Sequence, residues 1–181
     1  MASHTTWNRK FTEPAPKPKP TSDSTPLDFN AGPLVWIDCE MTGLDPRTDV
    51  ILEIAVVITN GNLEPVDEGI EYVIRTDKAI LDSPASPHTK DYVSRAVLEY
   101  IQKWVPEART AVLAGNSVHA DRAFLVGEMP AVVDWLHYRI VDVSSIKELC
   151  RRWYPSRSPP KSLFNGKHRA LDDIKGSIRG A

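Results

Sequence analysis

Four acidic residues and one histidine, spread over three separate stretches of the chain, have the residue types and spacing of a hydrolytic site. They are Asp38 and Glu40 in the first stretch, Asp121 in the second, and His168 and Asp173 in the third. If they converge, four carboxylates can hold two divalent ions about 3.5–4 Å apart, an arrangement used for phosphodiester hydrolysis. The ligands are all hard oxygens, so Mg²⁺ or Mn²⁺ is the expected metal. The histidine could take the proton of the attacking water.

Each stretch taken alone also has an ordinary structural explanation. Side chains alternate along a strand, so Asp38 and Glu40 point to the same face. Two solvated acids on an edge strand would have the same spacing without binding a metal. Asp121 could simply complement the N-terminal dipole of a helix. His168 and Asp173 could belong to a capped surface helix. The combination of the three stretches is what favours a metal site, and that site predicts a nuclease.

A small polar turn follows one of the expected strands, directly before Asp121. It consists of Gly115, Asn116 and Ser117. A phosphate that approaches the backbone closely needs such residues, because Gly115 leaves room and Ser117 can donate a hydrogen bond.

The composition allows one folded domain and excludes some partners. The chain has 181 residues, 41% of them hydrophobic, with a formal net charge of −2. That charge argues against a broad basic surface for long duplexes, but allows a short nucleic acid held by metal ions. No apolar run is long enough to span a bilayer, so we expect no membrane partner. Two cysteines, Cys39 and Cys150, suit an intracellular protein, either mitochondrial or cytoplasmic.

Hydrophobic periodicity predicts a tail and a single α/β domain. Residues 1–32 are rich in Pro, Lys, Ser and Thr and are expected to be a disordered tail, also compatible with a transit peptide; the domain is expected over 33–181. The expected strands are 34–38, 51–60, 70–75, 111–114 and 138–143, and the expected helices are 91–105, 121–128, 144–154 and 169–178. Ser144 or Ser145 is the expected N-cap of helix 144–154. This order predicts a ribonuclease H-like α/β fold with a mixed five-stranded sheet flanked by helices.

The three stretches resemble the signature motifs of the DEDD exonucleases, in the subgroup with a histidine in the third motif, and within it the oligoribonuclease family. The matching segments are residues 36–45 (WIDCEMTGLD), 114–125 (AGNSVHADRAFL), 137–144 (HYRIVDVS) and 168–174 (HRALDDI). The likeness covers residues 34–179. It implies a homodimeric 3′-to-5′ exoribonuclease that degrades short single-stranded RNA, including dinucleotides, to mononucleotides.

The resemblance also implies a role for each matching residue. The metal ligands would be Asp38, Glu40, Asp121 and Asp173, and the general base would be His168. For the substrate, Leu44 would wedge against the terminal bases, and Ser117 and Arg139 would bind the 5′ phosphate of a dinucleotide. Tyr138 would reach across the dimer. A guanidinium suits this task because its planar fork matches phosphate oxygens.

The sequence departs from the family in two places. After the expected strand 70–75 the family has a longer segment with a tryptophan and a histidine, and its last helix continues beyond Ala181. The tryptophan would stack on a base, worth roughly 1–3 kcal/mol. An alternative is therefore a catalytically weakened splice variant or paralogue that keeps the metal site but binds RNA less well. A DNA-proofreading exonuclease and a protein-interaction module based on the Pro-rich tail explain fewer of the motifs.

Overall fold

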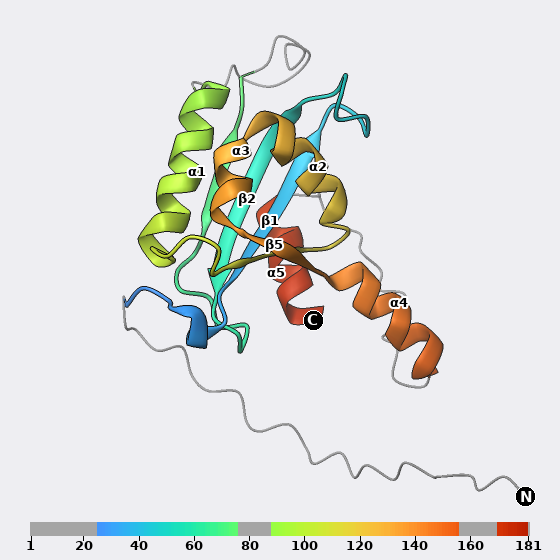
Figure 1. The fold of residues 1–181 in the computed structure, drawn as a ribbon. Coiled ribbons are helices and arrows are strands. Elements are labelled where there is room, and N and C mark those ends of the chain that lie inside the picture. The colour runs from blue at the N-terminus through green and yellow to red at the C-terminus, as the bar shows by residue number, and fades with distance from the viewer. Residues whose placement is uncertain (1–24, 76–87, 156–169, 181) are drawn as a thin grey trace, which may run out of the picture.

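The computed structural model describes residues 25–75, 88–155 and 170–180 of the chain. Its centre is one mixed sheet of five strands, in the order β3-β2-β1-β4-β5 (Figure 1). The strands are β1 (Leu34–Met41), β2 (Ile51–Thr59), β3 (Ile70–Val73), β4 (Val112–Gly115) and β5 (His137–Asp142). β2 runs antiparallel to both of its neighbours, β1 and β3, whereas β1, β4 and β5 run parallel to one another. The predicted mixed five-stranded sheet is confirmed.

The two central strands form because their side chains are apolar on both faces. β2 is rich in Ile and Val, which favour extended backbone, and β1 pairs with it along its whole length. Asp38 lies opposite Ala55 and Glu40 opposite Glu53. The register shifts between Glu40 and Met41, so the regular pairing is interrupted where the acidic pair ends.

Helices cover both faces of the sheet. α1 (Lys90–Trp104), α2 (His119–Glu128) and α3 (Pro130–Trp135) lie on one face, and α5 (Ala170–Gly180) lies on the other (Figure 1). α4 (Val143–Trp153) continues from β5 and projects away from the rest of the domain. None of the helices described in the structure is long and apolar enough to cross a membrane.

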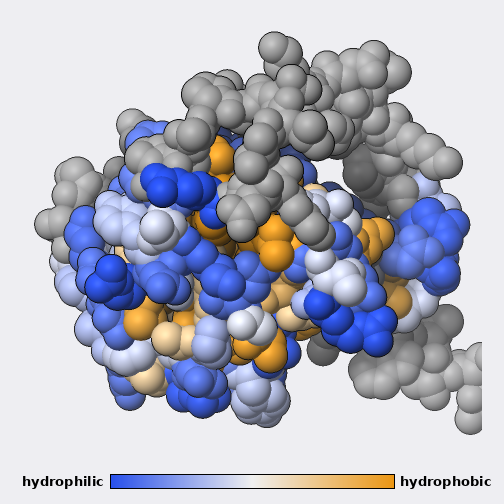
Figure 2. All heavy atoms as spheres, turned by 90° about the horizontal axis from the view of Figure 1, so that it is seen from above, coloured by the Kyte–Doolittle hydropathy of each residue, from blue (hydrophilic) through white to orange (hydrophobic). Residues whose placement is uncertain are grey.

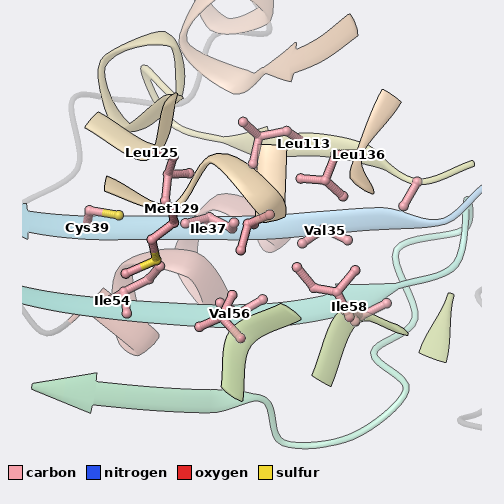
Figure 3. Close-up of a cluster of buried hydrophobic side chains, with 14 of the residues drawn as sticks. Val35, Ile37, Cys39, Ile54, Val56, Ile58, Leu113, Leu125, Met129 and Leu136 are labelled. Carbon is pink, nitrogen blue, oxygen red and sulfur yellow. The ribbon is translucent and has the colours of Figure 1, made fainter. Parts of the chain in front are cut away.

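The larger core lies between the sheet and α1–α3. Figure 3 shows Val35 and Ile37 of β1 and Ile54 of β2 directed to the same side as Leu125 and Met129. A smaller cluster on the opposite face packs Trp36 against residues of α5, including Ile174. Burial on both faces fixes the register of β1, because a slip by one residue would exchange its two faces.

The structure differs from the sequence-based expectations at several boundaries. β1 extends three residues beyond the predicted end at Asp38, and the short helix α3 was not predicted. The N-cap of α4 is Asp142, whose side chain accepts a hydrogen bond from the Ser144 backbone, so the prediction of Ser144 or Ser145 is wrong. Within the predicted tail, the described residues include a 3₁₀ turn at Phe29–Ala31.

Candidate active site

The alternation of β1 determines where its two carboxylates point. Val35, Ile37 and Cys39 belong to the core under α1–α3, whereas Trp36 belongs to the cluster under α5. Asp38 and Glu40 are two and four residues after Trp36, so they point to the same face as Trp36, the one that α5 covers.

Helix α5 brings a third carboxylate to this place. Its first turn carries Asp172 and Asp173. Asp172 is exposed, while Asp173 is partly buried. Carboxylate oxygens of Asp38, Glu40 and Asp173 all lie within 4.8 Å of one another, a spacing that one divalent ion could bridge.

The fourth predicted ligand, Asp121, lies beside this group in the first turn of α2. Its Oδ1 accepts a hydrogen bond of 2.9 Å from the backbone N–H of Cys39, the residue between Asp38 and Glu40. Only 5% of its surface is exposed. The sequence motifs from β1, α2 and α5, which lie far apart along the chain, therefore meet at the carboxyl end of β1.

The electrostatics of the site show how strongly the acids repel one another. Burial, and then the charges of Asp121, Asp173 and Glu40, raise the pKa of Asp38 to about 7. Burial also raises the pKa of Asp121 to about 6, although the hydrogen bond from Cys39 opposes this. A nearby divalent cation would relieve both effects, because it favours the ionised carboxylates.

The start of α5 is held by two further acids that the motifs did not indicate. Glu71 of β3 accepts a hydrogen bond of 3.4 Å from the backbone N–H of Leu171, and Glu53 of β2 accepts one from Ala170. Burial, and then the neighbouring Glu71, raise the pKa of Glu53 above its ordinary range. These contacts position the first turn of α5, and with it Asp173, against the sheet.

Leu44 projects from the loop between β1 and β2, at the same end of the sheet. It is 84% exposed, as a residue that contacts a ligand can be. The Asp49 carboxylate closes this loop, because Oδ1 accepts from the Thr42 hydroxyl at 2.9 Å and Oδ2 from the Asp45 backbone at 3.0 Å. A Cβ at Gly43 would lie 2.5 Å from Asp49 Oδ2, so a side chain there would have to displace this carboxylate.

The turn between β4 and α2 differs from the sequence interpretation in one respect. Gly115 is the last residue of β4, and a Cβ there would lie 2.8 Å from the carbonyl oxygen of Ile37. The close approach of β4 to β1 therefore requires a glycine here, a reason that the sequence did not indicate. Ser117 has a left-handed backbone with φ 56°, and its hydroxyl lies 2.9 Å from that of Ser144.

Tyr138 and Arg139 lie near the start of β5, the strand that pairs with β4, and both are exposed. The guanidinium carbon of Arg139 lies 5.4 Å from the centre of the Tyr138 ring, and that ring stacks on His137 at 4.5 Å. An exposed aromatic ring and a cation are thus available at the sheet edge. His168 lies outside the residues that the structure describes, as does the shortened segment after Leu81.

The comparisons with known proteins agree with this geometry. The exonuclease family model matches residues 35–179. The chain is 46% identical to a probable oligoribonuclease of Schizosaccharomyces pombe and to an oligoribonuclease of Mycobacterium bovis, with 81% of this chain covered in each case. It spans 64% of the length of the first relative and 76% of the second.

The chain belongs to the oligoribonuclease family of exonucleases. Among solved structures, exonuclease I of Methylocaldum szegediense matches 82% of this chain with a TM-score of 0.61 and 17% identity, covering 39% of that protein. A zinc-bound complex of Escherichia coli exonuclease I with single-stranded DNA gives a TM-score of 0.63 at 13% identity, again over 82% of this chain and 39% of that one. At this identity the likeness concerns the fold, and it confirms the predicted ribonuclease H-like architecture.

Several residues that shape the site were not found from the sequence. Asp49, Glu53, Glu71 and Asp142 each hold a loop or a helix end that carries a predicted site residue. Only Asp142 had a recognisable signal, because an Asp directly before an amphipathic segment is a typical N-cap. The other three act through contacts between strands or across a loop, which spacing along the chain does not reveal.

Proposed function

We propose that this protein is a 3′-to-5′ exoribonuclease that degrades short oligoribonucleotides, including dinucleotides, to mononucleotides. The observation that carries the proposal is the convergence of Asp38, Glu40 and Asp173 within 4.8 Å, beside the buried Asp121. Membership of the oligoribonuclease family supports the choice of RNA as substrate.

The residues present fit a pair of divalent metal ions. Asp38, Glu40, Asp121 and Asp173 supply only carboxylate oxygens, which Mg²⁺ and Mn²⁺ prefer. The raised pKa of Asp38 indicates negative charge that no neighbouring cation of the described chain compensates. When bound, such ions would polarise the scissile phosphate and stabilise the charge that develops on it.

The protein's own groups perform the remaining tasks. The four carboxylates would hold the ions, and we assign His168 to remove the proton of the attacking water. The histidine precedes Ala170, the first described residue of α5, by two positions, and its ordinary pKa near 6.5 suits proton transfer at neutral pH.

The loops around the site would select short substrates. We assign Leu44 to contact the terminal bases, and Ser117 and Arg139 to bind the 5′ phosphate of the second nucleotide. A longer RNA would have to extend past these two side chains, so the phosphate contacts favour a dinucleotide. Arg139→Ala is then expected to lower the rate on a 5′-phosphorylated dinucleotide more than on a longer RNA.

We further propose that the protein is a homodimer joined through α4. Every third or fourth residue of this helix is apolar and at least 40% exposed, as Ile146, Leu149 and Trp153 show. Of the α4 residues, all of which the structure describes, Val143 alone is buried. Tyr138, on the preceding strand β5, is also exposed, at 65%. The face seen from the end at which β1 finishes is mainly hydrophilic with smaller apolar areas (Figure 2). A regular apolar stripe on an exposed helix is typical of a surface that packs against a partner.

A second copy is the partner that this surface suits, because two such helices could pack their apolar stripes against each other. Leu149→Asp should therefore convert a dimer to a monomer in light scattering after gel filtration. Glu148→Ala, in the same turn but on the charged side with Arg151 and Arg152, is the matched control and should remain dimeric. A monomeric wild-type protein would contradict this assignment.

We place the activity in mitochondria or cytoplasm, which imaging of a tagged chain would test.

The weakened-enzyme alternative predicts the same site with poorer RNA binding. Kinetic comparison of this chain with the mycobacterial relative on one dinucleotide distinguishes the two: equal kcat/KM supports the full enzyme, and a KM raised tenfold to a hundredfold, the loss of about 1–3 kcal/mol of stacking, supports the alternative.

For the proposal itself, hydrolysis should stop with a chelator, and Asp173→Asn should lower the rate by about 10²-fold or more. The exposed neighbour Asp172 provides the matched control, since Asp172→Asn removes the same charge next to the site and should leave the rate nearly unchanged.

A further inference from the structure

Asp142 connects three segments of the chain at the point where β5 ends and α4 begins. Its Oδ1 accepts hydrogen bonds from the backbone N–H groups of Ser117, at 3.0 Å, and Ser144, at 2.9 Å. Its Oδ2 lies 3.1 Å from Nδ1 of His119. One carboxylate thus holds together the turn after β4, the first turn of α4 and the start of α2.

Two hydroxyl groups extend this network. The Ser117 and Ser144 hydroxyl oxygens lie 2.9 Å apart, and the Ser144 hydroxyl donates to Oδ1 of Asn116 at 3.0 Å. The orientation of the Ser117 side chain is therefore fixed from α4, the helix that Asp142 caps.

The backbone of Ser117 requires such support. Its φ of 56° lies in the left-handed region, which is disfavoured for residues with a side chain unless surrounding contacts hold them there. The hydrogen bond from the Ser117 N–H to Asp142 is the described contact that fixes this peptide group.

We propose that Asp142 is a positioning residue for recognition of the 5′ phosphate: it holds the Ser117 backbone so that the serine hydroxyl, whose hydrogen points to Ser144 in the free protein, can turn to donate to the phosphate bound by Arg139. This rests on the proposed function, in which Ser117 and Arg139 bind that phosphate. A carboxylate would repel the phosphate if it touched it, so Asp142 acts through the serine. Hydrogen-bond donors stabilise the ionised carboxylate of Asp142. Burial alone would raise its pKa, but hydrogen bonds from His119, Ser117 and Ser144 hold the pKa below the ordinary range.

Three substitutions separate this role from simple stabilisation of α4. Asp142→Asn keeps an oxygen that can accept from both backbone N–H groups. Asp142→Ala removes both hydrogen bonds. Asp142→Ser keeps an N-cap for α4, but its hydroxyl is too short to bridge to Ser117 as well.

The experiment measures kcat/KM on two RNA dinucleotides that differ only in carrying a 5′ phosphate or a 5′ hydroxyl, with Mn²⁺ present. The wild-type protein should prefer the phosphorylated form. Asp142→Ala and Asp142→Ser should reduce that preference about tenfold, as expected for loss of a hydrogen bond that places a charge-binding group, while Asp142→Asn should largely retain it. Asp28→Ala, which removes another N-cap carboxylate far from the site, should behave as wild type.

The outcomes are distinguishable. If the wild-type protein shows the preference and Asp142→Ser shows it equally, the inference is overturned and the proposed function stands. If all variants lose rate on both substrates equally, Asp142 has only a structural role, which also overturns the inference. If the wild-type protein cleaves both dinucleotides equally, the phosphate-binding role of Ser117 and Arg139 fails, and the inference fails with it.

Discussion

Asp38→Asn is expected to stabilise the metal-free protein while it removes activity. Burial and the charges of Asp121, Asp173 and Glu40 raise the pKa of Asp38 from its ordinary value of 3.8 to about 7. At about 1.4 kcal/mol for each unit by which the pKa rises, the ionised carboxylate could destabilise the folded state by at most about 4 kcal/mol. The side chain is half-buried and several acids share the repulsion, so solvent screening and coupling reduce the expected gain to about 1–2 kcal/mol.

The dependence on pH follows from the direction of this change. Asp38 holds its proton more tightly in the folded state than in the unfolded state, so its stabilising contribution is complete below about pH 4 and is lost as pH rises to about 7. The advantage of Asp38→Asn in the free energy of unfolding should therefore grow across this window and stay constant above it. For a chain of this length the gain corresponds to roughly 3–6 °C in Tm.

Thermal and urea unfolding with a chelator present, at about pH 5, 6, 7 and 8, measure this effect. Mn²⁺ should then raise the stability of the wild-type protein and have little effect on Asp38→Asn, because the substituted site binds the ion poorly. Asp172→Asn is the control: its carboxylate is exposed, so the substitution should give no gain at any pH. A metal-free Asp38→Asn protein less stable than wild type at pH 8, or an equal gain in Asp172→Asn, would refute the electrostatic reasoning.

Three further predictions concern the surroundings of this centre. Asp49→Asn should raise KM for dinucleotides by loosening the loop between β1 and β2, whereas Arg47→Ala, which removes only an exposed ion pair, should leave KM unchanged in steady-state assays. Gly115→Ala should lower the free energy of unfolding by about 1–3 kcal/mol, because its Cβ would press against the Ile37 carbonyl oxygen; an unchanged urea midpoint would argue against that contact. His168→Ala should lower kcat far more than substrate affinity and abolish the rise of rate with pH through the histidine range, and a normal pH–rate profile in this variant would contradict its role as base.

The sequence predicted those elements whose patterns are strong over a long stretch. The apolar run of β2 and the helical spacing of Val93, Val97 and Ile101 in α1 identified both elements to within two residues. Helix α3 was missed because its six residues give barely more than one turn of periodicity and begin with Pro130. The end of β1 was placed too early, since the polar residues after Ile37 do not show that pairing with β2 continues.

The candidate site divides in a similar way. The acids of the three motifs could be recognised because their residue types and order carry the chemistry. The residues that position them could not, because their partners are distant in sequence: Glu71 contacts Leu171, and Asp142 contacts Ser117. At Gly115 the sequence suggested room for a ligand, but it could not show that a carbonyl oxygen of the neighbouring strand requires a glycine there.

The most direct test of the central claim is the release of mononucleotides from a 5′-phosphorylated RNA dinucleotide by the purified chain, with Mn²⁺ and with a chelator. The convergent acids predict hydrolysis that requires the ion, falls by about 10²-fold or more in Asp38→Asn and Asp173→Asn, and persists in Asp172→Asn. Hydrolysis that continues with the chelator, or at the wild-type rate in Asp38→Asn, would contradict the account, as would a folded wild-type protein that releases no mononucleotide.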